Sequence, residues 1–294
     1  MRDIEIFYYF IMFAPFASVI GEFMHWSIER LIFIAWLAQV VFTPLIALPT
    51  DLVDNHFLLL ALSTGAVGAV AFFILTTTVM RTWHLSWPGL KPHWSGDFNW
   101  GIFAGLVVVD IIFMALNTGE MPRLHRANWD FTLSAFEAAV MEETLFRFAI
   151  LGILFYAWRN VKQRLPLALA TSSILFGIVH LTNYGPQEWS MTVLQAVSAA
   201  GIGLFFATVY VYTGQLWLAM VMHFLLDWTA FIASDSTLMT GKVTVQNWIG
   251  TGIELVVFIG IAVWMMFGQR RQVMERHVNR LTGEHQRFDF MIQY

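Results

Sequence analysis

The sequence predicts an all-α fold: a polytopic transmembrane bundle of about eight to nine helices around a polar intramembrane cavity. Of the 294 residues, 58% are hydrophobic and only 12% are charged, whereas an ordinary soluble domain has about 25% charged residues. The apolar residues form long runs, several of which reach the roughly 20 residues needed to cross a bilayer. A few ionisable side chains interrupt these runs, and such residues usually face the interior of a bundle.

Each apolar run is expected to be a helix, because lipid offers backbone N–H and C=O groups no partner outside their own segment. Proline, glycine and charged clusters separate the runs. The expected helices cover residues 4–24, 31–49, 57–80, 101–117, 131–158, 167–184, 190–213, 215–233 and 248–268. The N-terminus lacks a positively charged leader and a small-residue cleavage site, so the first run is interpreted as a retained span.

Positively charged residues predict the orientation, because cytoplasmic loops are enriched in Lys and Arg. Most of them fall on one side of the predicted bundle: Arg30, Arg81, Lys91, Arg159, Lys162, Arg164, Arg270, Arg271, Arg276, Arg280 and Arg287. We therefore expect a multi-pass protein of the inner or plasma membrane with a cytoplasmic C-terminal tail. Residues 269–281, basic with scattered apolar positions, suit a helix on an anionic membrane surface or a plain solvated tail.

The same composition limits the possible partners and chemistry. The absence of cysteine excludes disulfides, thiolate catalysis and cysteine metal ligands. The net charge of −4 is small and the charges form no basic domain face, so no nucleic-acid partner is expected. The expected partners are the lipid bilayer and a protein or peptide substrate.

Ionisable residues within the runs identify the candidate site, because a charge in mid-bilayer costs roughly 2.5–3.5 kcal/mol on insertion scales. Of the nine histidines, only His180 and His223 lie well within runs. The other ionisable residues within runs are Asp110, Glu137, Glu142, Glu143, Arg147, Asp227 and Glu254.

The run at 131–158 contains three of these residues within one and a half helical turns. Glu143 and Arg147 are four residues apart on one face, a spacing that favours an ion pair. Glu142 points about 100° away and has no partner in its own helix, which makes it a candidate general base. The alternative is a buried packing network without chemistry. Asp110 is a candidate second partner of Arg147 on charge grounds alone.

Two further pairs share a helix face at four-residue spacing. Phe176 would form an apolar wall beside His180. Asp227 would accept a hydrogen bond from one nitrogen of His223 and fix its tautomer, or would itself be protonated and donate to an oxyanion. A lone histidine in a span is more often a helix–helix hydrogen-bond partner, but three such sites on three helices favour chemistry.

Three motifs carry a resemblance to a known family. They are Glu142-Glu143-x-x-x-Arg147, Phe176-x-x-x-His180 and His223-x-x-x-Asp227. In this order they resemble the motifs of the CAAX-protease and bacteriocin-processing family of intramembrane glutamic endopeptidases, which is related to the type II CAAX prenyl endopeptidases. The resemblance covers roughly residues 131–235, which we therefore interpret as the catalytic core. Residues 1–130 would add N-terminal transmembrane helices, and residues 236–294 a last helix and the tail.

The resemblance implies peptide-bond hydrolysis without a metal or other cofactor. Glu142 would activate water, His180 would orient or deprotonate it, and His223 with Asp227 would line an oxyanion site. Supporting residues would be Glu143, Arg147 and Phe176. The prenyl endopeptidases have Asn where this chain has Asp227, so the resemblance points to bacterial processing, maturation or self-immunity rather than to prenylated substrates.

Three other functions fit the same residues. A zinc-dependent protease would use His180, His223, Asp227 and Glu142 as ligands, although the spans lack His-Glu-x-x-His. A proton-coupled transporter would use the intramembrane carboxylates and histidines as a relay, although the sequence shows no inverted repeat of interrupted helices. The third is a catalytically silent immunity or scaffold protein.

Overall fold

The structure is a computed structural model that describes residues 12–46, 54–85, 94, 97–118, 127–239 and 241–283. In chain order its helices are η1 (Ala14–Phe16), α2 (Ala17–Glu22), α3 (Ser27–Ile46), α4 (His56–Ser63), α5 (Ala66–Thr82), α6 (Trp100–Thr118), α7 (Trp129–Glu142), η4 (Glu143–Ile150), α8 (Leu151–Ala157), α9 (Arg164–Val179), η5 (His180–Asn183), α10 (Trp189–Thr213), α11 (Leu216–Ser234), α12 (Val245–Met265) and α13 (Gly268–Leu281). Every regular element in the described part of the chain is helical, so the predicted all-α fold is confirmed.

The helices follow the predicted apolar runs closely. Among the described residues, four helices are long and apolar enough to cross a membrane, namely 164–183, 189–213, 216–234 and 245–265. Helices α4 and α5 add a fifth if they count as one span bent by 61°. The remaining predicted spans fail this test or extend beyond the described residues. Four predicted features lie outside those residues: positions 4–11 of the first run, positions 47–49 of the second, Lys91 and Arg287.

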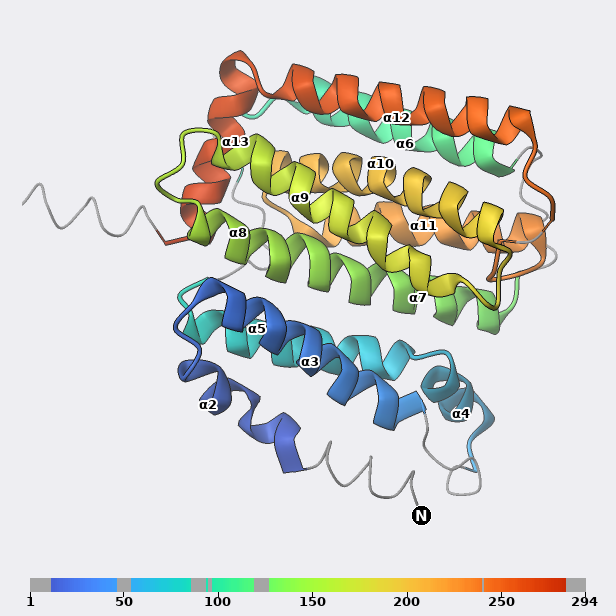
Figure 1. Ribbon diagram of the computed structural model, residues 1–294, viewed down its shortest axis with the longest axis horizontal. Coiled ribbons are helices and arrows are strands. Elements are labelled where there is room, and N and C mark those ends of the chain that lie inside the picture. Colours follow the sequence, from blue (N-terminus) through green and yellow to red (C-terminus); the bar gives the residue numbers. More distant parts are fainter. Residues whose placement is uncertain are drawn as a thin grey trace, which may run out of the picture.

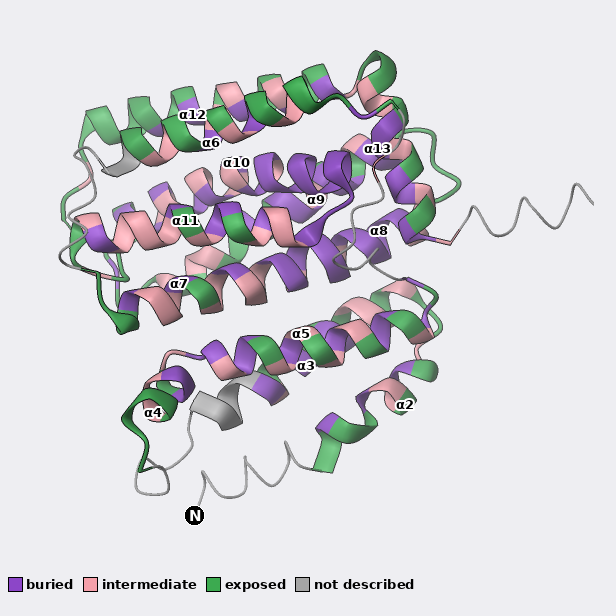
Figure 2. Cartoon of the chain, turned by 180° about the vertical axis from the view of Figure 1, so that it is seen from behind, coloured by how far each residue is buried: buried purple, intermediate pink, exposed green. Residues whose placement is uncertain are grey.

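The bundle is arranged around α10, the most buried of the four candidate spans, which packs against α9, α12, α11 and α13 (Figure 2). Helices α7, η4 and α8 follow one another as one long rod beside α9 and α11, and α6 lies next to α12 (Figure 1). Helices α2 to α5 lie on the other side of this rod. Gly177 allows close packing of α9 on α10, because a Cβ there would lie 2.5 Å from the carbonyl oxygen of Ala196.

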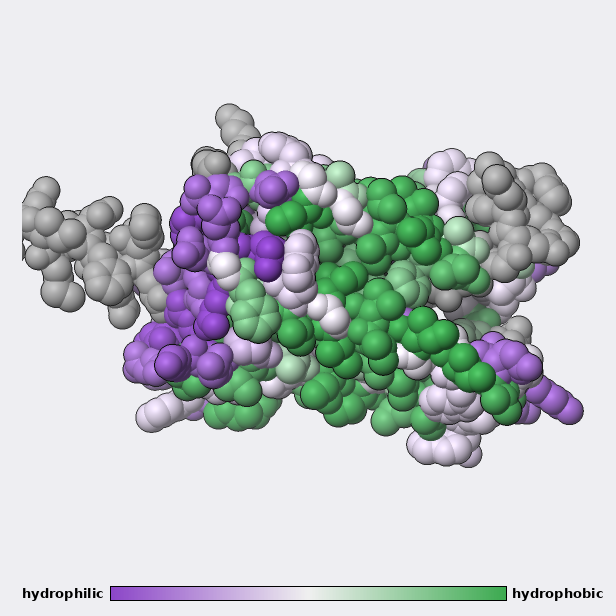
Figure 3. All heavy atoms as spheres, turned by 90° about the horizontal axis from the view of Figure 1, so that it is seen from above, coloured by the Kyte–Doolittle hydropathy of each residue, from purple (hydrophilic) through white to green (hydrophobic). Residues whose placement is uncertain are grey.

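The surface separates into an apolar belt and a hydrophilic end (Figure 3). The hydrophilic end contains α13 and the connection between α8 and α9, where several basic residues lie. The apolar side of α13 is buried against the protein and consists of Val273, Met274, Val278 and Leu281. Helix α13 therefore docks on the bundle through its apolar residues, so the interpretation of residues 269–281 as a plain solvated tail is wrong, whereas their position on an anionic membrane surface stays a prediction.

Candidate active site

The first motif lies where α7 changes into a π-helix. Glu142 is the last residue of α7, and Glu143 begins the π-helical segment η4. π-Helical turns are rare and often occur at functional sites. In η4, Glu143 and Arg147 are almost completely buried, and their Oε2 and Nε atoms are 3.2 Å apart. The ion pair predicted from the four-residue spacing is therefore present.

Aromatic rings complete the surroundings of Arg147. Its guanidinium carbon lies 4.2 Å from the centroid of the Phe176 ring. Gly203 on α10 makes room for this stack, because a Cβ there would lie 2.8 Å from Phe176 and 3.5 Å from Nη2 of Arg147. Among the described residues, neither Nη1 nor Nη2 has a hydrogen-bond partner. The buried charge of Arg147 is thus balanced by Glu143 and by ring faces.

His223 is the centre of the cluster, because its two nitrogens face three carboxylates. Its Nδ1 lies 2.8 Å from Oε1 of Glu143. Its Nε2 lies 3.3 Å from Oδ2 of Asp227 and 3.6 Å from Oε2 of Glu142. The imidazole stacks on Phe206 with ring centroids 5.3 Å apart. Glu143 therefore links Arg147 to His223, and it orients the histidine more closely than Asp227 does.

His180 lies where α9 ends and the short 3-10 helix η5 begins. Its Nδ1 is 2.8 Å from the carbonyl oxygen of Phe176. A carbonyl oxygen only accepts, so Nδ1 carries the proton and Nε2 is left as an acceptor. His180 interacts electrostatically with Glu142, and its ring packs 4.7 Å from that of Phe176. The apolar wall predicted beside His180 is therefore present.

Two further carboxylates from the interrupted runs lie at the cluster. Asp110 on α6 is buried and interacts electrostatically with His223, whereas the charged neighbours of Arg147 are Glu143 and Glu142. The interpretation of Asp110 as a partner of Arg147 is therefore wrong. Glu137 interacts with Glu142, Asp227 and His223. Its position within an apolar run identified Glu137 as an intramembrane carboxylate, but helical spacing predicted no partner for it.

Another intramembrane carboxylate stands apart from this cluster. Glu254 on α12 accepts a hydrogen bond from Ser198 Oγ at 3.0 Å, and among the described residues its interactions involve none of the three motifs. All seven motif residues, in contrast, come together at the junction of α7, α9 and α11. The structure thus assembles three sequence-distant motifs into one buried polar centre.

Residues 125–229 match the family model described as type II CAAX prenyl endopeptidase Rce1-like. The helices of this segment are therefore similar to those of the CAAX proteases. The match supports an intramembrane CAAX-type endopeptidase as the general class of the protein, acting on a protein or peptide substrate in a membrane. Neither a curated protein nor a solved structure matches the chain.

The zinc alternative needs three or more ligands arranged around one point. Within the described residues, no group of three His, Asp or Glu side chains is placed to hold a metal ion. The described residues therefore include the residue types that a zinc site needs, but not in an arrangement that would bind zinc.

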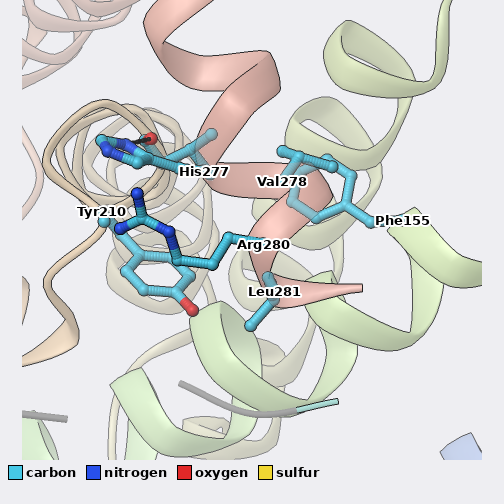
Figure 4. Close-up of a pocket in the computed structure, with 8 residues that line it drawn as sticks. Phe155, Tyr210, His277, Val278, Arg280 and Leu281 are labelled. Carbon is cyan, nitrogen blue, oxygen red and sulfur yellow. Dashed lines mark hydrogen bonds between the residues drawn. The ribbon is translucent and has the colours of Figure 1, made fainter. Parts of the chain in front are cut away.

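A separate small cavity lies where α8, α10 and α13 meet (Figure 4). His277 lines it and donates from Nδ1 to the carbonyl oxygen of Val211 at 2.9 Å. Burial lowers the pKa of His277 to about 4, so its imidazole is neutral near pH 7. None of the motif residues lines this cavity. Its apolar walls and neutral histidine suit packing of α13 on α8 and α10 rather than catalysis.

Proposed function

We propose that this protein is an intramembrane endopeptidase of the glutamate type that hydrolyses a peptide bond of a membrane-associated or exported protein. The observation that carries the proposal is the convergence of three carboxylates on His223, together with His180, which interacts electrostatically with Glu142 and keeps Nε2 as an acceptor. A buried packing network would satisfy each polar group within the protein. Here the Glu142 side chain is still 25% exposed, and Nε2 of His180 is left to accept a proton.

In the proposed reaction, Glu142 and His180 act on one water molecule. Glu142 takes a proton from the water as the oxygen adds to the carbonyl carbon of the peptide bond. His180 accepts a hydrogen bond through Nε2 and holds the water in line. The proton then passes to the leaving nitrogen as the C–N bond breaks, giving a free carboxylate and a new N-terminus.

His223 is proposed to act as a cation. Both of its nitrogens face carboxylate oxygens, and a bare nitrogen lone pair against a carboxylate would be repulsive unless a proton lay between them. A proton on each nitrogen satisfies Glu143 and Asp227 together. The resulting imidazolium offsets part of the negative charge of the cluster and stabilises the oxyanion that forms in the transition state.

Asp227→Asn separates the two roles open to Asp227. If the carboxylate holds His223 as a cation, the amide removes a full charge, and we expect proteolysis to fall by about 10²-fold or more at neutral pH. The alkaline limb of the pH–rate profile should also move to lower pH, because His223 then loses its proton more easily. Rates on one peptide substrate across pH, for both proteins, make the measurement. An Asn variant as active as wild type, with no alkaline limb, would show instead that a protonated Asp227 donates a hydrogen bond to the oxyanion.

The basic residues at the hydrophilic end support a cytoplasmic position for α13 in the inner or plasma membrane. Helix α9 begins at this end and carries His180 at its opposite end, so we propose that the active site is reached from the exoplasmic side. The chain has no cysteine, which makes single-cysteine labelling clean. Cysteine at Arg271 should be shielded from an impermeant maleimide in intact cells, and cysteine at Glu188 should react. The reverse pattern would invert the orientation.

The function itself is tested on whole membranes. Quantitative N-terminal proteomics of cells expressing wild type or Glu142→Gln should reveal N-termini that occur only with the wild type. These termini identify the substrate and its cleavage site together. Identical sets of N-termini at equal expression would contradict a proteolytic role.

A further inference from the structure

Three amide side chains form a cluster directly beyond His180. Asn183 ends η5, Gln187 lies in the connection to α10, and Gln195 lies in the second turn of α10. Oε1 of Gln195 accepts hydrogen bonds from Nδ2 of Asn183 and from Nε2 of Gln187, each at 2.9 Å. None of the three belongs to the motifs that identified the site.

The local geometry places this amide cluster beside the proposed chemistry. In a 3-10 helix, side chains three residues apart lie on the same edge, with a rise of about 2 Å per residue. Asn183 therefore follows His180 on one edge of η5, roughly 6 Å further along. The close approach of α9 and α10 at Gly177 fixes the position of Gln195, which is adjacent to Ala196. The backbone N–H of Gln187 donates to the carbonyl oxygen of Asn183 at 3.1 Å, which holds the connection against η5.

The cluster leaves both acceptor and donor capacity unused. Gln187 is only 5% exposed, and its Oε1 has no hydrogen-bond partner among the described residues. A buried acceptor in this state is unfavourable unless a donor reaches it. The NH₂ group of Gln195 donates in none of the hydrogen bonds between described residues. One orphan acceptor and one available donor match the N–H and C=O of a peptide main chain.

We infer that the amide cluster binds the main chain of the substrate beside the scissile bond, with Gln187 Oε1 accepting a backbone N–H and the Gln195 NH₂ group donating to a backbone C=O. This inference rests on the proposed protease function. A helical substrate uses its N–H and C=O groups internally, so they are free only in an extended segment. The substrate class is therefore a peptide segment that is unwound at the cleavage site, and its recognition depends little on side chains.

The test measures KM and kcat separately on purified full-length protein in detergent. A library of internally quenched short peptides first selects the sequence that wild type cleaves best. Gln187→Met keeps the length of the side chain but removes its acceptor, and we expect KM to rise about 3–10-fold with kcat changed less than about twofold. Gln215→Met is the matched control, because Gln215 is also a buried glutamine with one unpartnered amide atom but precedes α11. Its KM should equal that of wild type.

A second arm uses substrates in which one backbone amide at a time is replaced by an ester, which removes a single N–H. At one ester position, the KM of wild type should rise by the same factor as the Gln187→Met substitution causes. The same ester should not raise the KM of Gln187→Met any further. If no ester position changes KM for wild type, or if every penalty is the same in the variant, the inference fails and a water molecule fills the cluster. The ester series on wild type alone decides the matter if Gln187→Met does not fold. If wild type cleaves the library no faster than Glu142→Gln, the protease function fails, and the inference fails with it.

Discussion

Glu142→Gln is expected to reduce peptide hydrolysis by about 10²–10⁴-fold, the contribution typical of a positioned general base. The amide keeps the shape of the side chain but cannot take a proton from water. The fold should survive, because Glu142 is partly exposed and its nearest charged contact, to Nε2 of His223, is 3.6 Å. Single-turnover rates on a quenched peptide, with thermal unfolding of the same preparation, provide the measurement.

Glu254→Gln is the matched control for this prediction. It makes the same change at another buried carboxylate within a span, which pairs with Ser198 rather than with the site, and it should retain the wild-type rate. Wild-type turnover by Glu142→Gln would remove Glu142 from the mechanism. The same preparation tests the zinc hypothesis, because a glutamate-type rate should be unchanged after exhaustive chelation. A rate that is lost on chelation and restored by added zinc would establish metal catalysis instead.

Much of this site follows from helical spacing alone. The apolar runs predicted where the helices lie because lipid forces each run to pair its own backbone groups. The four-residue interval between Glu143 and Arg147 predicted their ion pair because side chains at that spacing share a helix face. The same interval brought Asp227 to His223, and Phe176 to His180. Each of these contacts lies within one helix or at its end, so the sequence specifies it without knowledge of the packing.

The contacts between different helices depend on how the helices are rotated against one another. The contact of Glu143 with His223 joins residues 80 positions apart, and no local pattern encodes the angle between α11 and η4. Asp110 was wrongly placed for the same reason, since charge alone does not choose between Arg147 and His223. The π-helical segment also escaped prediction, because a short π-helical stretch leaves little mark on an apolar run. Gly65 bends the run at 57–80 through a left-handed φ of 83°, and a lone glycine predicts such a bend poorly.

Arg147→Leu should cost about 3–5 kcal/mol of stability, the loss typical of breaking a buried ion pair from one side. Glu143 would remain buried without its cation, and the ring of Phe176 would lose the guanidinium that stacks on it at 4.2 Å. Because Glu143 also contacts Nδ1 of His223 at 2.8 Å, a protonated or displaced Glu143 would disturb the histidine as well. We therefore expect lower yield, a lower melting temperature and a lower kcat together, whereas Glu142→Gln lowers kcat alone.

The control for this stability change is Arg271→Leu, because the chain offers the same type of pair at its surface. Arg271 and Glu275 are also four residues apart, with Nε and Oε1 at 3.5 Å, but their side chains are 36% and 27% exposed. An exposed pair contributes about 0–1 kcal/mol, so Arg271→Leu should leave the melting temperature nearly unchanged. Thermal unfolding of both variants in one detergent provides the comparison. If the two variants lose equal stability, the buried pair contributes no more to stability than the exposed one. The proposed role of the Glu143–Arg147 pair in holding His223 would then have to be abandoned.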